Sequence, residues 1–256
     1  MVATAVIVIG GDPPPASIVA VLPPERFVIA ADSGYDHAIA LGLTVDLLVG
    51  DLDSISAAGL VDARRRGIVI EEHSPDKDAT DTELALIGAV ERGFDQVVGI
   101  FGGGDRLDHA LAALFAFAAP HLSGCRVTLW WGDTRIIVLH DGDAVEPAGS
   151  PGEPFSLLPL HGPATGVDIV GARYPLTNAC VAAGSSLGIS NLFGTAPSVV
   201  RLGTGTVIHI TPHTVANTLP TTVPNTAPDT LATITPHTVG NILRTTAPDI
   251  LPKDDS

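Results

Sequence analysis

The stretch LLVGDLDSIS at residues 47–56 places two aspartates directly after a short apolar segment. The apolar residues and the glycine predict a buried strand that ends at Asp51. Side chains at i and i+2 of an extended segment project the same way, so we expect Asp51 and Asp53 to point together, with Leu52 turned back into the protein. Paired carboxylates suit Mg²⁺, which takes one or two of them together with water and a substrate phosphate. The structural alternative is that Asp53 and Ser54 only cap the next helix.

The stretch SPDKDATDTELAL follows a later apolar segment and carries three further charges. Thr80 and Glu83 have the spacing of a capping box that opens a helix, which explains those two residues. Asp76, Lys77 and Asp78 remain unexplained by the cap. Lys77 is one of two lysines in the chain, and a lysine between aspartates suits a phosphate that is bridged to a metal. The alternative is a solvated loop.

The stretch GGGDRLDHALAAL joins a glycine-rich loop to the start of a helix. Such a loop lets backbone amides approach a phosphate, the helix dipole favours the anion, and Arg106 adds a positive charge. The alternative is a tight turn in which Asp108 is the N-cap. The chain has neither the G-x-x-x-x-G-K-[ST] phosphate loop nor the G-x-G-x-x-G dinucleotide fingerprint, and its histidines lack zinc-site spacing.

The elements that position these residues alternate in type along the first half of the chain. Continuous apolar segments predict strands, listed here in order: AVIVIG, FVIAAD, LLVGD, GIVIEEH and QVVGIFGG. Four helical segments follow the second to the fifth of these strands: GYDHAIALG, AAGLVDARRRG, DTELALIGAVERG and DHALAALFAFAAP. This pattern predicts an α/β fold with a Rossmann-like parallel sheet covered by helices on both faces. Because ligands bind outside the carboxyl ends of such strands, the acidic loops that follow four of them are expected to share one crevice.

The pattern changes after Gly124, where apolar segments follow each other without helices between them. They predict separate strands in RVTLWWGD, TRIIVLHDGD, EPFSLLPLHG, GVDIVGARYPL and SVVRLGTGTVIHITP. We expect an α/β catalytic domain over 1–124 and a smaller, mostly antiparallel domain over 125–211. Residues 212–256 are rich in threonine and proline, a composition that does not build a packed core, so we expect a disordered tail there.

Composition narrows the class of function. The net charge is -15 and the pI is about 4.7, which leaves no basic surface for nucleic acid or for an anionic membrane. Two cysteines do not make a disulfide framework and fit a reducing cytoplasm. The apolar N-terminus has no positive region before Arg26, so we interpret it as a first strand rather than a signal peptide.

Taken together, the motifs resemble those of the thiamine pyrophosphokinase family, in content and in order over residues 4–211. The resemblance rests on ADSG, DLDS, DKDATD and GGGDRLDH in the first half, and on LLPL, GARYPL and GSSLGISN in the second. It implies an α/β catalytic domain followed by a β-sandwich domain, in a homodimer whose sites lie between subunits. It also implies transfer of a diphosphoryl group from ATP to the hydroxyl of thiamine, with release of AMP. Three departures are Ser33 for a glycine, two extra residues before Arg106, and Tyr174 where many members have tryptophan.

The resemblance also implies roles for individual residues. Those roles are Mg²⁺ binding and catalysis by Asp51, Asp53 and Asp78, ATP binding by Asp32, Asp76, Lys77, Asp81, Arg106 and Asp108, and thiamine binding by Tyr174, Ser190 and Asn191. Tyr174 would stack on the thiamine cation from the partner subunit, although an isolated tyrosine is more often an ordinary core or edge aromatic. Ser190 and Asn191 would hydrogen-bond the pyrimidine, or else form a plain turn.

Two alternative functions remain open from the sequence. One is a hydroxymethylpterin diphosphokinase of similar fold, which makes the same transfer to a neutral acceptor. The Y-P-L and S-N segments favour thiamine over the pterin, because the resemblance places them in the thiamine pocket. The other is a non-catalytic thiamine- or nucleotide-binding protein, and the number of carboxylates facing an anionic ligand argues against it.

Overall fold

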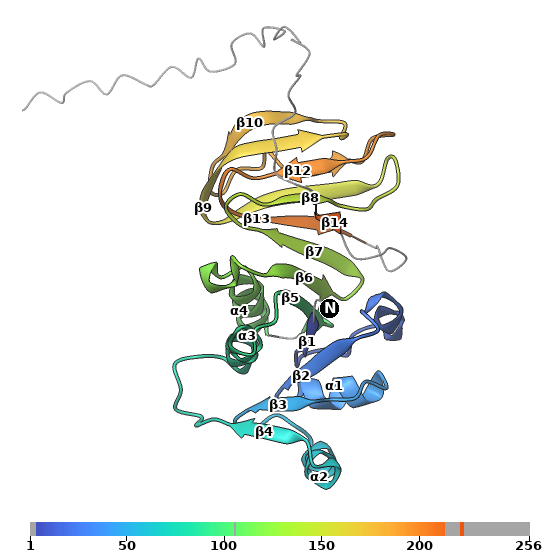
Figure 1. Ribbon diagram of the computed structural model, residues 1–256, viewed down its shortest axis with the longest axis vertical. Helices are drawn as coiled ribbons and strands as arrows, with labels where there is room; N and C mark the ends of the chain where they lie inside the picture. The colour runs from blue at the N-terminus through green and yellow to red at the C-terminus, as the bar shows by residue number, and fades with distance from the viewer. Residues whose placement is uncertain (1–3, 105, 213–220, 223–256) are drawn as a thin grey trace, which may run out of the picture. The chain divides into compact units, whose positions relative to one another are not determined.

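The computed structural model of the chain describes residues 4–104, 106–212 and 221–222 (Figure 1). Its helices are η1 (Ala16–Val21), α1 (Gly34–Ala40), α2 (Ala57–Arg66), α3 (Asp81–Glu91), α4 (Leu107–Phe117) and η2 (Pro120–Leu122). The strands of the first half are β1 (Thr4–Val8), β2 (Arg26–Ala31), β3 (Leu47–Gly50), β4 (Val69–Glu72) and β5 (Gln96–Phe101). Those of the second half are β6 (Arg126–Trp131), β7 (Thr134–Leu139), β8 (Ala144–Glu146), β9 (Pro154–Val170), β10 (Leu176–Val181), β11 (Asn191–Leu192), β12 (Val199–Arg201), β13 (Thr204–Thr211) and β14 (Thr221–Thr222).

The first half contains a parallel sheet in the order β5-β1-β2-β3-β4. The five strands and four α-helices predicted there are all present, which confirms the mixed α/β class. The order places β1 between β5 and β2, so the chain changes direction across the sheet at β1. The loops after these strands therefore open onto one edge, where ligands bind in folds of this type.

The strands are buried on both faces, which is why they read as continuous apolar segments. In β1, Ala5 and Ile7 face a core cluster that includes residues of α3 and α4. Val6 and Val8 alternate with them and face a second cluster, which contains residues of η1, α1 and α2. Helices thus cover both faces of the sheet (Figure 1).

The sheet continues into the second half through β6, which is parallel to β5 and antiparallel to β7. Beyond β7 the pairings are antiparallel, in the order β7-β13-β9-β12-β8-β14, and β10 and β11 both pair with β9. These strands enclose a third core cluster that includes Phe155, Ile169 and Val207. The boundary expected at residues 124 and 125 falls just before β6, within this continuous sheet.

The expectation of separate strands in EPFSLLPLHG and GVDIVGARYPL was wrong. A single 17-residue strand, β9, covers nearly all of the first segment and the first five residues of the second, and it changes partner along its length. Its first part pairs with β13, and its last residues pair with β10 and β12. His161 and Gly166 have φ values of 60° and 64°, so the strand bends between the two sets of partners without ending.

The C-terminal region expected to be a disordered tail lies outside the described residues, except for Pro212 and β14. The backbone of β14 pairs antiparallel with β8, Thr221 opposite Glu146 and Thr222 opposite Val145. Within the described part of the chain, no helix combines the length and the apolar character needed to span a bilayer.

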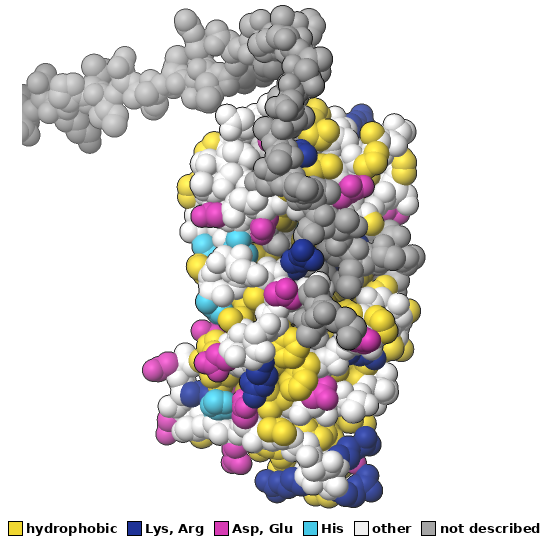
Figure 2. All heavy atoms as spheres, viewed as in Figure 1, with side chains coloured by type: hydrophobic (Ala, Val, Ile, Leu, Met, Phe, Trp, Pro, Cys, Tyr) yellow, Lys and Arg dark blue, Asp and Glu magenta, His cyan; other side chains and the backbone are white. Residues whose placement is uncertain are grey.

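Helix α2 carries a concentration of basic side chains at its C-terminal end. Arg64, Arg65 and Arg66 occupy its last turn, and dark blue side chains gather at that end of the molecule in Figure 2. Two of them pair with Asp62 one turn earlier, at 2.6 Å each. Positive charge at a helix C-terminus is favourable, so these arginines stabilise α2 locally.

Candidate active site

A cleft of about 480 Å³ lies at the carboxyl ends of the parallel strands. The loops after β1, β2, β3 and β5 contribute to it, together with the loop before α3 and the first turns of α3 and α4. Its lining residues from the predicted site are Asp32, Asp51, Asp53, Lys77, Asp81 and Arg106. Loops that follow β2, β3, β4 and β5 thus contribute to one cleft, as we expected for the four acidic loops.

Three carboxylates meet inside the cleft. Oxygens of Asp32, Asp51 and Asp53 all lie within 4.8 Å of one another, a group that could hold a metal ion. Asp32 is buried, Asp51 is half-buried and Asp53 is exposed. Such a set of hard oxygen donors, open to solvent on one side, has the chemistry that Mg²⁺ prefers.

Asp32 reaches the group because β2 and β3 end side by side. Its backbone N–H donates to the carbonyl of Val49 at 2.8 Å, and its Oδ2 accepts from the backbone N–H of Ser54 at 3.2 Å. Its other oxygen, Oδ1, is buried and has no hydrogen-bond partner among the described residues. Burial raises the pKa of Asp32, and the charges of Asp81 and Asp53 raise it further. A buried carboxylate that leaves one oxygen without a hydrogen-bond partner, in a group with two other acids, fits a cation at this point.

The backbone around Asp51 is not the extended segment that we expected. Strand β3 ends at Gly50, and Leu52 has a φ of 65°, in the left-handed region. Leu52 does pack against the core, as expected, and the left-handed turn brings Asp51 and Asp53 together. A Cβ on Gly50 would lie 3.1 Å from the Cβ of Asp32, so glycine lets the two strand ends approach.

Asp53 and Ser54 do not cap α2, so that alternative was wrong. The N-cap is Ser56, whose Oγ accepts from the backbone N–H of Gly59 at 2.9 Å. Asp53 instead accepts a bond from the Ser54 hydroxyl at 2.8 Å. Asp53 therefore has no helix-capping role.

Lys77 is the cation closest to these acids. Its Nζ lies 2.8 Å from Asp51 Oδ2 and 3.0 Å from Asp81 Oδ1. Burial by itself would lower the pKa of Lys77, but hydrogen bonds and charge attraction from Asp51 and Asp81 outweigh it and raise the pKa. The hydrogen bond from Lys77 lowers the pKa of Asp51. Asp81 is the first residue of α3. The helix begins there because the side-chain oxygen of Thr80, its N-cap, accepts a hydrogen bond from the backbone N–H of Glu83 at 3.2 Å, and this start places Asp81 beside Lys77.

Arg106 and Asp108 form an exposed ion pair beside the start of α4, with Nη2 and Oδ2 2.7 Å apart. This pairing holds the pKa of Asp108 at about 2. The N-cap of α4 is Arg106 and not Asp108, so the capping alternative for Asp108 was wrong. Arg106 lines the cleft, and so does His109 one turn into the helix. We did not predict His109 as a site residue, although it lies inside the GGGDRLDH motif.

Asp76 and Asp78 are not brought into the carboxylate group. Both are exposed, and neither lines the cleft among the described residues. The sequence grouped Asp78 with Asp51 and Asp53, whereas in the structure Asp32 takes the third place. The roles of Asp76 and Asp78 stay predictions.

The predicted thiamine-binding residues cluster on the second half of the chain, and none of them lines the cleft as described. Tyr174 is 56% exposed, and the guanidinium of Arg173 lies 5.5 Å from its ring centroid. Asn191 is buried: its Oδ1 accepts from the backbone N–H of Tyr174 at 3.0 Å, and its Nδ2 donates to the Tyr174 carbonyl at 2.7 Å. Asn191 therefore fixes the backbone of Tyr174, a role that the sequence did not reveal. Ser190 is exposed in the adjoining turn, with a φ of 57°.

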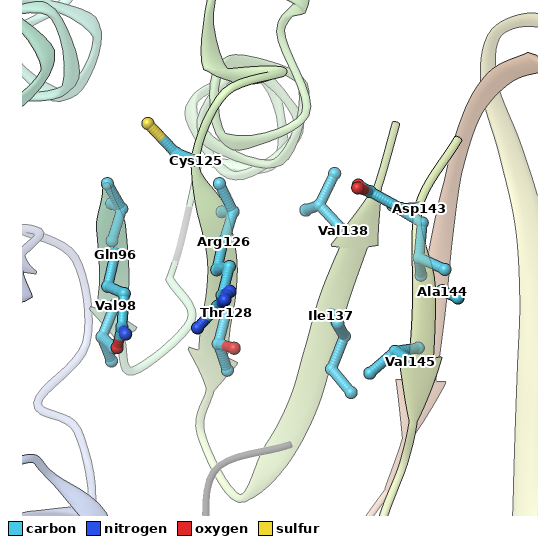
Figure 3. A pocket seen from close by; sticks show the side chains of 13 residues that line it. Gln96, Val98, Cys125, Arg126, Thr128, Ile137, Val138, Asp143, Ala144 and Val145 are labelled. Atoms are coloured by element: carbon cyan, nitrogen blue, oxygen red, sulfur yellow. The ribbon is translucent and has the colours of Figure 1, made fainter. Parts of the chain in front are cut away.

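A second cavity, of about 130 Å³, lies where the parallel and antiparallel strands meet (Figure 3). Side chains of Val98, Thr128 and Ile137 line it from β5, β6 and β7, and Asp143 and Val145 line the opposite wall. It contains none of the predicted site residues. Six of the predicted site residues line the cleft at the strand ends instead.

Comparison with known proteins gives two family models that match the chain in order. The model described as "Thiamin pyrophosphokinase, catalytic domain" matches residues 20–129, and that described as "Thiamin pyrophosphokinase, vitamin B1 binding domain" matches residues 144–206. The thiamine pyrophosphokinase of Bacillus subtilis (strain 168) is 27% identical over 165 residues, which cover 64% of this chain and 76% of that protein.

Solved structures are similar over most of the described chain. The crystal structure of thiamine pyrophosphokinase from Bacillus subtilis has a TM-score of 0.72 and 23% identity, and covers 82% of this chain and 98% of its own. A thiamin pyrophosphokinase family protein from Enterococcus faecalis has a TM-score of 0.69 and 25% identity, and covers 81% of this chain and 98% of its own.

Proposed function

The chain belongs to the thiamine pyrophosphokinase family, and from this premise we propose that its cleft binds ATP with Mg²⁺ and directs the ATP β-phosphorus toward the hydroxyl of thiamine. The reaction is ATP-dependent diphosphorylation of thiamine, which gives thiamine diphosphate and AMP. The observation that carries the proposal is the group of Asp32, Asp51 and Asp53 beside Lys77 at the carboxyl ends of the parallel strands.

We propose that Asp32, Asp51 and Asp53 hold Mg²⁺. Asp32 replaces Asp78 in this set because one of its oxygens lies within 4.8 Å of oxygens of Asp51 and Asp53, and its buried Oδ1 has no hydrogen-bond partner among the described residues. When bound, Mg²⁺ neutralises charge on the triphosphate and supports the in-line geometry that diphosphoryl transfer needs.

The basic residues of the cleft are proposed to bind the triphosphate. Lys77 is oriented by Asp51 and Asp81, so its ammonium is held at the cleft before ATP arrives. Arg106 stands at the start of α4, where the helix dipole also favours an anion. Gly10, Gly11 and Gly104 line the cleft and present backbone without side chains, which leaves room for a nucleotide.

Thiamine binding is proposed to need a second subunit. The first support is that Tyr174, Ser190 and Asn191 lie outside the cleft of their own chain. The second is a set of exposed apolar side chains: Leu107, Leu111 and Phe115 lie one turn apart along α4, next to the cleft, and Leu187 and Ile189 lie just before Ser190 and Asn191 in sequence. A homodimer in which the second half of one subunit faces the cleft of the other would cover both surfaces and complete each site.

Two further proposals concern the organisation of the chain and its location in the cell. We propose the division into a catalytic part over 1–124 and a thiamine-binding part over 125–211, in line with the change of strand pattern. We also propose a cytoplasmic location, supported by Cys125 and Cys180, which are both free thiols.

The function is tested by incubating the purified protein with ATP, Mg²⁺ and thiamine and separating the products by chromatography. The expected products are AMP and thiamine diphosphate, and both should disappear when Mg²⁺ is chelated. ADP in place of AMP would contradict diphosphoryl transfer. AMP formed with hydroxymethylpterin but not with thiamine would contradict the acceptor, and absence of turnover with either would favour a binding protein.

A further inference from the structure

The loop that carries Asp51 and Asp53 is held by two carboxylates from the segment after β2. This loop connects β3 to α2 and spans residues 51–56. Asp32 Oδ2 accepts from the backbone N–H of Ser54 at 3.2 Å. Asp36, on the first turn of α1, accepts two bonds from Ser56: one from the backbone N–H and one from the hydroxyl, each at 2.8 Å. The loop is thus fixed at its middle by a member of the carboxylate group and at its end by an acid outside it.

The bonds at Ser56 have a defined direction. The Ser56 Oγ accepts from the backbone N–H of Gly59 at 2.9 Å, and therefore donates its proton to Asp36. A Cβ on Gly59 would lie 2.2 Å from Asp36 Oδ1, so a side chain there would displace the carboxylate. Asp36, Ser56 and Gly59 consequently form one unit that joins α1 to the start of α2.

Helix α2 has a second, independent attachment to α1. The hydroxyl of the buried Tyr35 donates to Asp62 Oδ2 at 3.0 Å, and Asp62 is also paired with Arg65 and Arg66. Loss of Asp36 would therefore release the end of the loop while Tyr35 and Asp62 keep the helix in place.

We propose that Asp36 is a positioning residue for the cation site: it holds Ser56 so that the loop keeps Asp53 beside Asp51 and Asp32. Asp36 is not a member of the carboxylate group and does not line the cleft among the described residues, so it acts through the loop. This inference rests on the proposed function, because it takes Asp32, Asp51 and Asp53 to bind a divalent cation.

The test measures Mn²⁺ binding to the purified chain from the electron paramagnetic resonance signal of the free ion, without ATP or thiamine. Asp36→Ala should weaken Mn²⁺ binding by about tenfold or more, the usual effect of removing a residue that orients metal ligands. Asp36→Asn keeps an oxygen that can accept a hydrogen bond from the Ser56 N–H, so its loss of Mn²⁺ affinity should be smaller than that of Asp36→Ala. In turnover assays, Asp36→Ala should raise the KM for Mg²⁺, recover most of kcat at saturating Mg²⁺, and leave the KM for thiamine unchanged.

Asp46 provides the matched control. Its Oδ2 accepts from the backbone N–H of Val28 at 2.7 Å, so it also joins a carboxylate to the backbone, but just before β3, at the opposite end of that strand. Asp46→Ala should leave Mn²⁺ affinity unchanged. Equal Mn²⁺ affinity in Asp36→Ala and wild type would overturn the inference, and so would an equal loss in Asp46→Ala, since that would indicate general destabilisation.

Asp53→Asn separates this inference from the proposed function. If the wild type binds Mn²⁺ and Asp53→Asn does not, the cation site is supported, and the Asp36 result decides the inference alone. If the wild type fails to bind Mn²⁺, or Asp53→Asn binds it equally well, the proposed cation site itself is contradicted.

Discussion

At the scale of single residues, Asp53 is the most exposed member of the carboxylate group and the one whose removal should disturb the fold least. It lies after the left-handed turn at Leu52, and its carboxylate accepts a bond from the hydroxyl of neighbouring Ser54. Three acids close together repel one another when no cation is present, so the group is arranged for binding and contributes little to stability.

Asp53→Asn should lower kcat/KM by about two orders of magnitude or more, because it removes one charged ligand from the proposed site. The melting temperature measured with chelator should stay the same or rise slightly, since one repulsive charge is gone. Asp95→Asn is the matched control, because Asp95 is an exposed acid just before β5, at the amino ends of the strands. Turnover near the wild-type rate in Asp53→Asn would exclude Asp53 from the site.

Tyr174 tests the proposed thiamine contact. Tyr174→Ala should weaken thiamine binding by about 1–2 kcal/mol, which is the value expected for a cation over an aromatic ring in a partly desolvated site. Tyr174→Phe keeps the ring and should bind thiamine nearly as well as the wild type. Isothermal titration calorimetry measures both variants, and equal affinity of Tyr174→Ala and wild type would reject the stacking role.

At the scale of elements, β13 carries an unusual residue into the core of the second half. His209 is fully buried and stacks on Phe155, with ring centroids 4.8 Å apart. Burial, reinforced by the charge of Arg135, lowers the pKa of His209 to about 3. The folded protein therefore keeps this histidine neutral at pH values where the unfolded chain protonates it.

The consequence is a dependence of stability on pH with a definite sign. The lowered pKa makes the contribution of His209 fully present above the unfolded value of about 6.5, and that contribution is lost as the pH falls toward 3. Between pH 7.5 and pH 5 the free energy of unfolding should fall by about 2 kcal/mol from this residue. Chemical denaturation of wild type and His209→Phe at both pH values measures it, because the variant should lack this part of the loss. His121→Phe, at an exposed histidine, is the control and should keep the full pH dependence. An unchanged pH dependence in His209→Phe would contradict the prediction.

At the scale of the whole molecule, the proposed shared site makes two defective variants able to complement each other. Asp53→Asn damages the cleft, and Tyr174→Ala damages the surface offered to the partner's cleft. In a mixed dimer one site carries both changes and the other carries neither. Co-refolding equal amounts should therefore restore about a quarter of wild-type activity at limiting thiamine, since about half of the dimers are mixed and each has one intact site. Activity equal to the mean of the separate variants would show that each chain holds a complete site.

The C-terminal region gives a second test at this scale. All proposed site residues lie between Asp32 and Asn191, so ending the chain after Thr222 should leave kcat and both substrate KM values unchanged. Ending it after Pro212 also removes β14 and leaves the paired edge of β8 without its neighbour. We therefore expect the shorter chain to melt at a lower temperature than the longer one in differential scanning calorimetry. A large loss of activity in the longer chain would show that residues 223–256 take part in the reaction.

The sequence by itself determined the features that depend on neighbouring residues. Segments such as AVIVI and LLV are apolar throughout because both faces of a parallel strand are buried, so the strands and their order of alternation with helices could be predicted. Asp51, Asp53 and Lys77 could be proposed as site residues because charged side chains a few positions apart are visible in the sequence. The cap at Thr80 was found for the same reason.

The tertiary structure alone decided which distant residues meet and through which backbone. Asp32 joins Asp51 and Asp53 because β2 and β3 end side by side, and no local pattern predicts this pairing of residues 18 positions apart. The left-handed turn at Leu52, the bend of β9, and the hydrogen bonds by which Asn191 fixes Tyr174 and Asp36 fixes Ser56 depend likewise on contacts between separate segments. Local propensity sets the type of an element, whereas register and packing set the geometry of a site, and packing is a property of the folded chain as a whole.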